Sequence, residues 1–236
     1  MPAKNPHYWE SRSGEQGTTW YQDRWLDWYT DRMWKDAYRR LGVDVAGKSV
    51  IDVGCGDGKY SHFLKAEGAK VVVGVDLFDY DPQSAEGVAF RHSIDAEKLS
   101  SYGFGHFDLA VVSGVLEFVK SREVVLVELA KVAEEAMIIE EIQETIPEYK
   151  KGLDYERPFT WKRFQDDVWC ARWRIARWVP MNVLDRGIIV HVPKWLWWFI
   201  CGLTLVLDWF LVRWPLFRFV KRHTRFRALH LVRLVR

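Results

Sequence analysis

The sequence predicts an α/β protein built on a doubly wound, mostly parallel β-sheet. Three observations carry this prediction. Short β-branched apolar runs, each the length of a buried strand, alternate with segments that read as helices. The first run leads into a turn with three glycines in five residues, and two later runs are followed directly by an acidic residue. Strands and helices that alternate at this spacing are typical of a parallel sheet covered by helices.

The length of 236 residues predicts one domain of ordinary size plus an appendage. We expect a helical cap over 1–44, an α/β domain over 45–192 and a helical tail over 193–236. Cys55, Cys170 and Cys201 lie far apart, so their spacing indicates neither a zinc site nor a disulfide framework and suits a reducing compartment. The N-terminus lacks the apolar core of a signal peptide.

A helix is expected near the N-terminus, where Thr19–Gln22 fits a capping box. It should run to about Arg40 and end at Gly42. Aromatic side chains gather on one of its faces (Trp25, Trp28 and Tyr29). Packing of this face on the domain is the favoured interpretation, and a lid over a substrate pocket is the alternative.

The first strand, Val50–Val53, is followed by Gly54, Gly56 and Gly58 and then by a segment that can start a helix. Glycines in such a turn allow positive φ and let a ligand approach the backbone, and the first N–H groups of the helix favour an electron-rich partner. The phosphate-binding loop of nucleotide hydrolases is excluded because Tyr60 follows Lys59. The dinucleotide pattern G-x-G-x-x-G would need its third glycine two residues later.

Acidic residues follow the second and third strands. Lys70–Val75 leads into Asp76, which lies 24 residues after Asp52, and Val88–Glu97 supplies the third strand with Asp95 near its end. Ligands of doubly wound sheets bind at the carboxyl ends of the strands, where an acid can accept hydrogen bonds from ribose hydroxyls.

The remaining elements continue the alternation. Phe107–Ser113 predicts a fourth strand, Glu123–Val132 a helix and Ala136–Glu141 a fifth strand.

Together these motifs resemble the class I S-adenosylmethionine-dependent methyltransferases. Asp52 with the run GCGDG matches their first motif, and Val115–Val119 (VLEFV) matches their loop after the fourth strand except that Phe118 replaces a histidine. The resemblance covers about residues 45–145 well and 146–192 loosely. In the loosely covered part, Thr160–Val168 resembles the family's late helix, and the resemblance implies two final strands over 171–178 and Gly187–Val192. It implies a seven-stranded Rossmann-like sheet with one antiparallel strand, and S-adenosylmethionine as cofactor.

The resemblance also implies roles for single residues. Asp52 would orient the glycine loop, Asp76 would hold the ribose, and Asp95 would accept from the adenine amine beside the backbone N–H of Ala96. The complete set of expected cofactor-binding residues is Asp52, Gly54, Cys55, Gly56, Gly58, Asp76, Leu77, Asp95, Ala96 and Ser113.

No catalytic metal is expected, because the histidine partner is missing and Ser113 stands where a second acid would be. If the acceptor is a hydroxyl, Glu117 is the first candidate for a general base and Tyr21 the second. A loop hydrogen bond and a packed aromatic ring are the plainer interpretations of these two residues.

The C-terminal tail is apolar and basic. Residues 195–212 (WLWWFICGLTLVLDWFLV) carry one charge, Asp208, and as a helix they would extend about 27 Å, just enough to cross a bilayer core. Residues 213–236 contain no acid and place apolar residues at i+3/i+4 steps beside arginines, which is typical of an interfacial amphipathic helix. Residues 194–236 contain nine Lys or Arg and one acid, a net charge of +8. Since the whole chain has a net charge of +2, residues 1–193 have a net charge of −6.

This charge asymmetry predicts that residues 194–236 bind an anionic lipid surface. The cofactor is cytoplasmic, and a single crossing would carry eight Lys or Arg to the far side, against the positive-inside tendency. We therefore favour a monotopic tail on the cytoplasmic face of a membrane over a spanning one. A buried oligomer interface and an RNA-binding surface are the alternatives, of which RNA is disfavoured because the basic residues alternate with Leu, Val and Phe.

The expected function is methylation of a lipid, lipid-linked or otherwise apolar acceptor at a membrane. The alternative is a soluble small-molecule or RNA methyltransferase whose tail mediates oligomerisation or partner binding.

Overall fold

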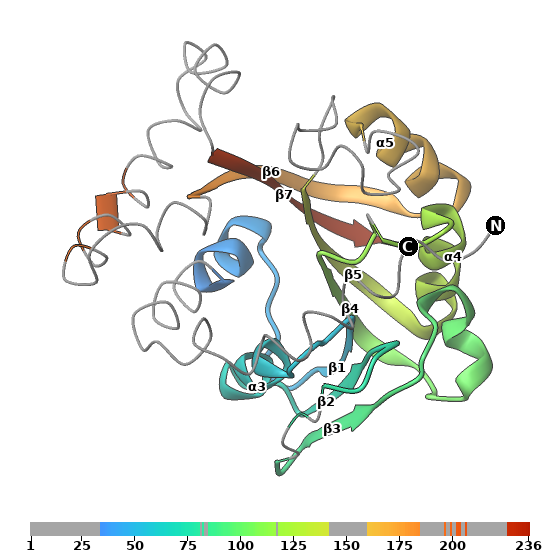
Figure 1. The fold of residues 1–236 in the computed structure, drawn as a ribbon. Coiled ribbons are helices and arrows are strands. Elements are labelled where there is room, and N and C mark those ends of the chain that lie inside the picture. Colours follow the sequence, from blue (N-terminus) through green and yellow to red (C-terminus); the bar gives the residue numbers. More distant parts are fainter. Residues whose placement is uncertain are drawn as a thin grey trace.

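A seven-stranded β-sheet forms the centre of the structure, in the order β3-β2-β1-β4-β5-β7-β6 (Figure 1). The computed structural model describes residues 34–80, 82, 85–116, 118–141, 160–184 and 226–236, and residues 196, 199, 202, 203 and 206. Its strands are β1 (Ser49–Val53), β2 (Val71–Val75), β3 (Val88–Arg91), β4 (Phe107–Ser113), β5 (Ala133–Glu141), β6 (Arg174–Leu184) and β7 (Phe226–Val235). The first five strands are parallel, and β7 runs antiparallel to both of its neighbours.

Helices cover both faces of the sheet (Figure 1). Helical residues 34–41 and α3 (Lys59–Ala66) pack on one face, where their apolar side chains meet Val50, Leu109 and Met137. The 3₁₀ helix η1 (Ala96–Tyr102), α4 (Arg122–Val132) and α5 (Trp161–Cys170) pack on the other face. This two-sided burial explains why the central strands read as nearly continuous apolar runs.

Side-chain caps begin several of these helices. Ser121 accepts a hydrogen bond from the N–H of Val124 at the start of α4, and Thr160 accepts from the N–H of Arg163 at the start of α5. The N-terminal helix ends at Gly42, as expected, where φ is +64°. Its expected beginning at Thr19, and the aromatic face of that part, lie outside the described residues.

The last strand corrects the expected C-terminal tail. Residues 226–235, which the sequence pattern placed in an amphipathic helix, form β7 between β5 and β6. Leu231, Val232 and Leu234 are buried, because one face of β7 packs under α5 and the other under the opposite helical layer. The sheet therefore extends beyond the boundary expected at residue 192. The strand expected over Gly187–Val192 lies outside the described residues.

β6 begins at Arg174 and continues to Leu184, so it overlaps the strand expected over 171–178 and is longer. It pairs with β7 from end to end, with Leu184 opposite Phe226. Because Glu141 at the end of β5 lies opposite Leu229, near the start of β7, both ends of the connection 185–225 lie at the carboxyl edge of the parallel strands. No helix in the described part of the chain has the length and apolar character needed to cross a membrane.

Candidate functional site

A cavity of about 400 Å³ lies at the carboxyl edge of the sheet, bounded by the residues that follow β1, β2, β3 and β4. Eight of the ten expected cofactor-binding residues line it: Gly54, Cys55, Gly56, Asp76, Leu77, Asp95, Ala96 and Ser113. Asp52 and Gly58 do not. Tyr21 and Glu117, the candidates for a general base, lie outside the described residues.

The three glycines after β1 all have positive φ, and their surroundings differ. A Cβ added to Gly54 would lie closer than 3.0 Å to Val115 Cγ2. A Cβ added to Gly58 would also lie closer than 3.0 Å to the ring of Phe90. A Cβ on Gly56 would meet no atom within 4 Å. Gly54 and Gly58 are therefore required for close packing, whereas Gly56 presents bare backbone to the cavity.

Asp76 connects the glycine turn to the end of β2. Its Oδ2 accepts from the N–H of Gly56 at 2.9 Å and its Oδ1 accepts from the N–H of Phe78 at 3.0 Å. Burial raises the pKa of this carboxyl, and the backbone hydrogen bonds from Phe78, Gly56 and Leu77 oppose that effect. Because each carboxylate oxygen can accept more than one hydrogen bond, Asp76 keeps acceptor capacity toward the cavity that it lines.

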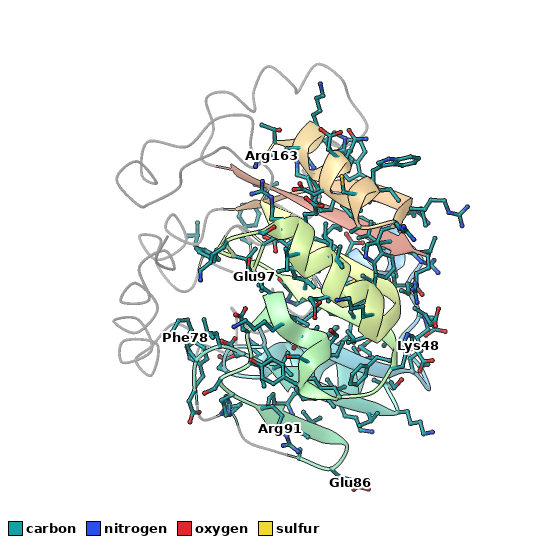
Figure 2. All side chains as sticks on the ribbon, turned by 90° about the vertical axis from the view of Figure 1, so that its right-hand side faces the viewer. Lys48, Phe78, Glu86, Arg91, Glu97 and Arg163 are labelled. Atoms are coloured by element: carbon teal, nitrogen blue, oxygen red, sulfur yellow. The ribbon has the colours of Figure 1, made fainter. Side chains whose placement is uncertain are left out.

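Asp95 caps η1, and its Oδ1 accepts from the N–H of Glu97 at 2.9 Å. Glu97 in turn accepts from the N–H of Ser121 at 2.5 Å, so the loop after β3 is joined to the start of α4. Figure 2 shows Glu97 where η1 and α4 meet. The connections after β3 and β4 are thus joined beside the cavity, which residues of both connections line.

Asp52 lies beneath the cavity. The residue is 2% exposed, and its Oδ2 accepts from Ser61 Oγ of α3 at 2.6 Å. Burial raises the pKa of Asp52 to about 7; the hydrogen bond from Ser61 lowers it, and the charges of Asp76 and Asp57 add to the rise. The contact with Ser61 joins β1 to α3, so the described contacts of Asp52 are structural.

Cys55 lines the cavity, and burial followed by the charges of Asp52 and Asp76 raises the pKa of its thiol. A thiol that is hard to ionise is a poor nucleophile, so Cys55 contributes a small apolar wall.

The cavity has further walls that sequence reasoning missed: Phe78, Tyr80, Glu97, Phe118, Val119 and Lys120. Each of these residues lies within seven residues of the end of a strand, and a predicted site residue lies at or shortly after each of those strand ends. This proximity is the signal that could have identified them. Among the described residues, no group of three or more His, Cys, Asp or Glu side chains is arranged to hold a metal ion.

Comparisons with known proteins agree with this geometry. A family model described as a methyltransferase domain matches residues 25–178, more than half of the chain. Over 50 residues the chain is 46% identical to a tRNA U34 carboxymethyltransferase of Stutzerimonas stutzeri. That match covers 21% of this chain and only 15% of the length of that protein.

Solved structures share the fold at low sequence identity. An S-adenosylmethionine-dependent methyltransferase of Mesorhizobium loti is 18% identical, with a TM-score of 0.53 over 86% of this chain and 97% of that one. A methyltransferase of the same cofactor class from Archaeoglobus fulgidus is 14% identical, with a TM-score of 0.56 over 87% and 94%. A cyclopropane-fatty-acyl-phospholipid synthase-like protein of Lactobacillus casei is 12% identical, with a TM-score of 0.55 over 90% and 92%.

The family match and the seven-stranded sheet lead to the same conclusion. The chain belongs to the methyltransferase-domain family, and it shares its fold with S-adenosylmethionine-dependent methyltransferases of known structure.

Proposed function

We propose that this methyltransferase binds S-adenosylmethionine in the cavity beside Gly56 and methylates a lipid, lipid-linked or otherwise apolar acceptor at the cytoplasmic face of a membrane. The observation that supports an apolar acceptor concerns the apolar run 195–212. This run belongs to the connection 185–225, whose two ends lie at the same edge of the sheet as the cavity.

The residues around the cavity fit the cofactor. Gly56 offers backbone with open space in front of it, and Asp76 offers carboxylate oxygens at the end of the neighbouring strand. Asp95 and the N–H of Ala96 lie at the end that the loop after β3 forms. In our proposal Asp76 accepts from the ribose hydroxyls, and Asp95 and Ala96 bind the adenine.

The bound cofactor would supply an electrophilic methyl group on a sulfonium. The chain's own residues would orient the two reactants and exclude water, because in-line displacement depends on alignment. Val115, Phe118 and Val119 form apolar walls of the cavity and suit the exclusion of water. Glu117, between Leu116 and Phe118 in the sequence, remains our proposed proton acceptor if the acceptor atom is a hydroxyl oxygen.

The pairing of β6 with β7 bears on how the apolar run could meet a membrane. Both strands belong to one sheet, so residues 184 and 226 lie on one side of any bilayer. A chain that crosses a bilayer once ends on the opposite side. A run that enters and leaves on one side, or lies flat in the interface, is therefore the form of membrane contact that we propose.

The basic charge available to lipid is smaller than the whole tail suggests. Arg233 forms an ion pair with Glu135 and its Nη1 donates to the carbonyl of Gly42 at 2.6 Å, so it belongs to the domain. Six Lys or Arg residues lie in 194–225, and these are the cations that we propose for contact with anionic headgroups.

The test combines methyl transfer with membrane binding. The full chain is incubated with labelled S-adenosylmethionine and a total extract, and the label is then measured in lipid, protein and RNA fractions. Vesicle flotation compares the wild type with a variant in which 195–212 is replaced by a Gly/Ser linker of equal length, which leaves β7 intact. We expect label in lipid and flotation that the replacement abolishes; label confined to another fraction, or equal flotation of both proteins, would reject the lipid proposal.

RNA is the second candidate acceptor, and the 46% identity over 50 residues to a tRNA U34 carboxymethyltransferase favours it. The same fractionation decides between the two candidates. Label in RNA, together with an oligomer that depends on 195–212, would support the alternative in which the tail mediates assembly.

A further inference from the structure

Glu140, near the end of β5, holds the loop that follows β4. Its side chain is completely buried, and its Oε1 accepts from two consecutive backbone amides. The N–H of Val115 donates at 2.7 Å and the N–H of Leu116 at 2.8 Å. Buried backbone N–H groups require an acceptor, and a carboxylate that accepts from two of them forms stronger hydrogen bonds than a neutral group does.

Further contacts fix the same loop. The N–H of Gly114 donates to the carbonyl of Ile139 at 2.9 Å, and the N–H of Phe118 donates to the carbonyl of Val115 at 2.9 Å. Leu116 is fully buried. The end of β5 therefore holds the backbone of Gly114, Val115 and Leu116.

The loop also meets the glycine turn after β1. Val115 Cγ2 occupies the space that a side chain on Gly54 would need, and Val115, Gly114 and Phe118 line the cavity. Glu140 itself does not line the cavity. A direct series of contacts thus leads from the carboxyl group of Glu140, through Val115, to the glycine turn.

We propose that Glu140 is a positioning residue for methyl transfer: by binding the amides of Val115 and Leu116, it sets the wall of the cofactor cavity that faces the glycine turn. This proposal rests on the proposed cofactor site. It assigns Glu140 no contact with cofactor or acceptor.

Three substitutions test it in the full chain. Glu140→Gln keeps an oxygen of the same reach but removes the charge, Glu140→Asp keeps the charge but is one methylene shorter, and Glu140→Ala removes the acceptor. Glu135→Gln is the matched control, because Glu135 lies on the same strand, is 8% exposed and accepts from Lys48 and Arg233 at the opposite edge. The readouts are the Kd of S-adenosylmethionine by calorimetry, the hydrogen exchange of the Val115 and Leu116 amides, and the thermal midpoint.

We expect Glu140→Asp and Glu140→Ala to raise the Kd about tenfold and to accelerate exchange at both amides, as the loss of charge-assisted hydrogen bonds implies. Glu140→Gln should give about a threefold rise in Kd, with faster exchange at the same two amides. Glu135→Gln should lower the thermal midpoint without changing either of the other two readouts.

If Glu140→Gln leaves both the exchange and the Kd unchanged, the proposal is wrong even if the other two variants fail to fold. Equal rises in Kd for Glu135→Gln and Glu140→Gln would also overturn it, because the effect would then reflect general destabilisation. Asp76→Ala separates this failure from failure of the cofactor site: a normal Kd for Asp76→Ala rejects the site itself, whereas a raised Kd beside unaffected Glu140 variants rejects only the role of Glu140.

Discussion

Two carboxylates at the ends of neighbouring strands have opposite surroundings. Asp76 lines the cavity and accepts from the amides of Gly56 and Phe78, whereas Asp52 is buried below it and accepts from Ser61. The alternation of side chains along β1 explains this difference, because Val50 and Asp52 both face the helical layer that contains α3. The same residue type therefore lines the cavity after β2 and has a structural role in β1.

Asp76→Ala should weaken the binding of S-adenosylmethionine by about 1–3 kcal/mol, the scale of losing charged hydrogen bonds. Calorimetric titration measures this change. Asp79→Asn is the control, since Asp79 follows in the same loop, its side chain is 70% exposed and it does not line the cavity. An unchanged Kd in Asp76→Ala would remove Asp76 from the cofactor site.

The raised pKa of Asp52 predicts how stability depends on pH. In the unfolded chain this carboxyl titrates near its ordinary value of 3.8, and in the folded chain near about 7. Between these values the folded state holds the extra proton, so the free energy of unfolding contributed by Asp52 falls as pH rises, by at most about 1.4 kcal/mol per pH unit. Above about pH 7 this contribution is constant.

Asp52→Asn removes this titration and can still accept from Ser61 Oγ. The stability of the variant relative to the wild type should therefore increase from pH 5 to pH 7 and level off at pH 8. Urea unfolding at these values measures the difference. Parallel pH profiles for the two proteins would show that Asp52 does not titrate in this range.

At the scale of elements, the turn after β1 and the loop after β4 interlock. Gly54 has a φ of +77°, and the methyl group of Val115 fills the space beside its Cα. Gly54→Ala combines an unfavourable backbone conformation with a steric clash, so we expect it to lower stability by about 1–3 kcal/mol. The midpoint of chemical unfolding checks this value.

A second substitution separates the cost of the backbone conformation from the cost of the steric clash. In Gly54→Ala/Val115→Ala the clash is relieved and the backbone strain remains, so part of the lost stability should return, as a double-mutant cycle would measure. Strictly additive effects of the two substitutions would contradict the direct contact between these elements.

The sequence predicted the elements whose signals are local. The strands β1 to β5 and the residues directly after them could be recognised from apolar runs that end in glycine or acid. β7 could not, because the run LHLVRLV satisfies the helical and the extended period equally well and only its hydrogen bonds to β5 and β6 decide between them. The contacts of Glu140 were equally hidden, since they depend on which backbone amides the fold brings opposite its side chain.

At the scale of the whole molecule, the insertion of β7 determines the topology of any membrane contact. Leu184 and Phe226, which precede and follow the connection that contains the apolar run, belong to one sheet, so both lie on the same side of any bilayer. We consider a chain in which Cys170 and Cys201 have been replaced and a single cysteine has been introduced at Lys194 or at Arg213. Either cysteine should react with an impermeant maleimide added outside vesicles. Cys55 is buried and contributes little labelling.

In a chain that retains Cys170 and Cys201, vesicles should protect Cys201, which lies within the apolar run, and should leave the exposed Cys170 of α5 fully reactive. Mass spectrometry of the labelled peptides measures both rates in one sample, so Cys170 serves as the internal control. Equal reactivity of the two thiols with and without vesicles would argue against insertion of the run.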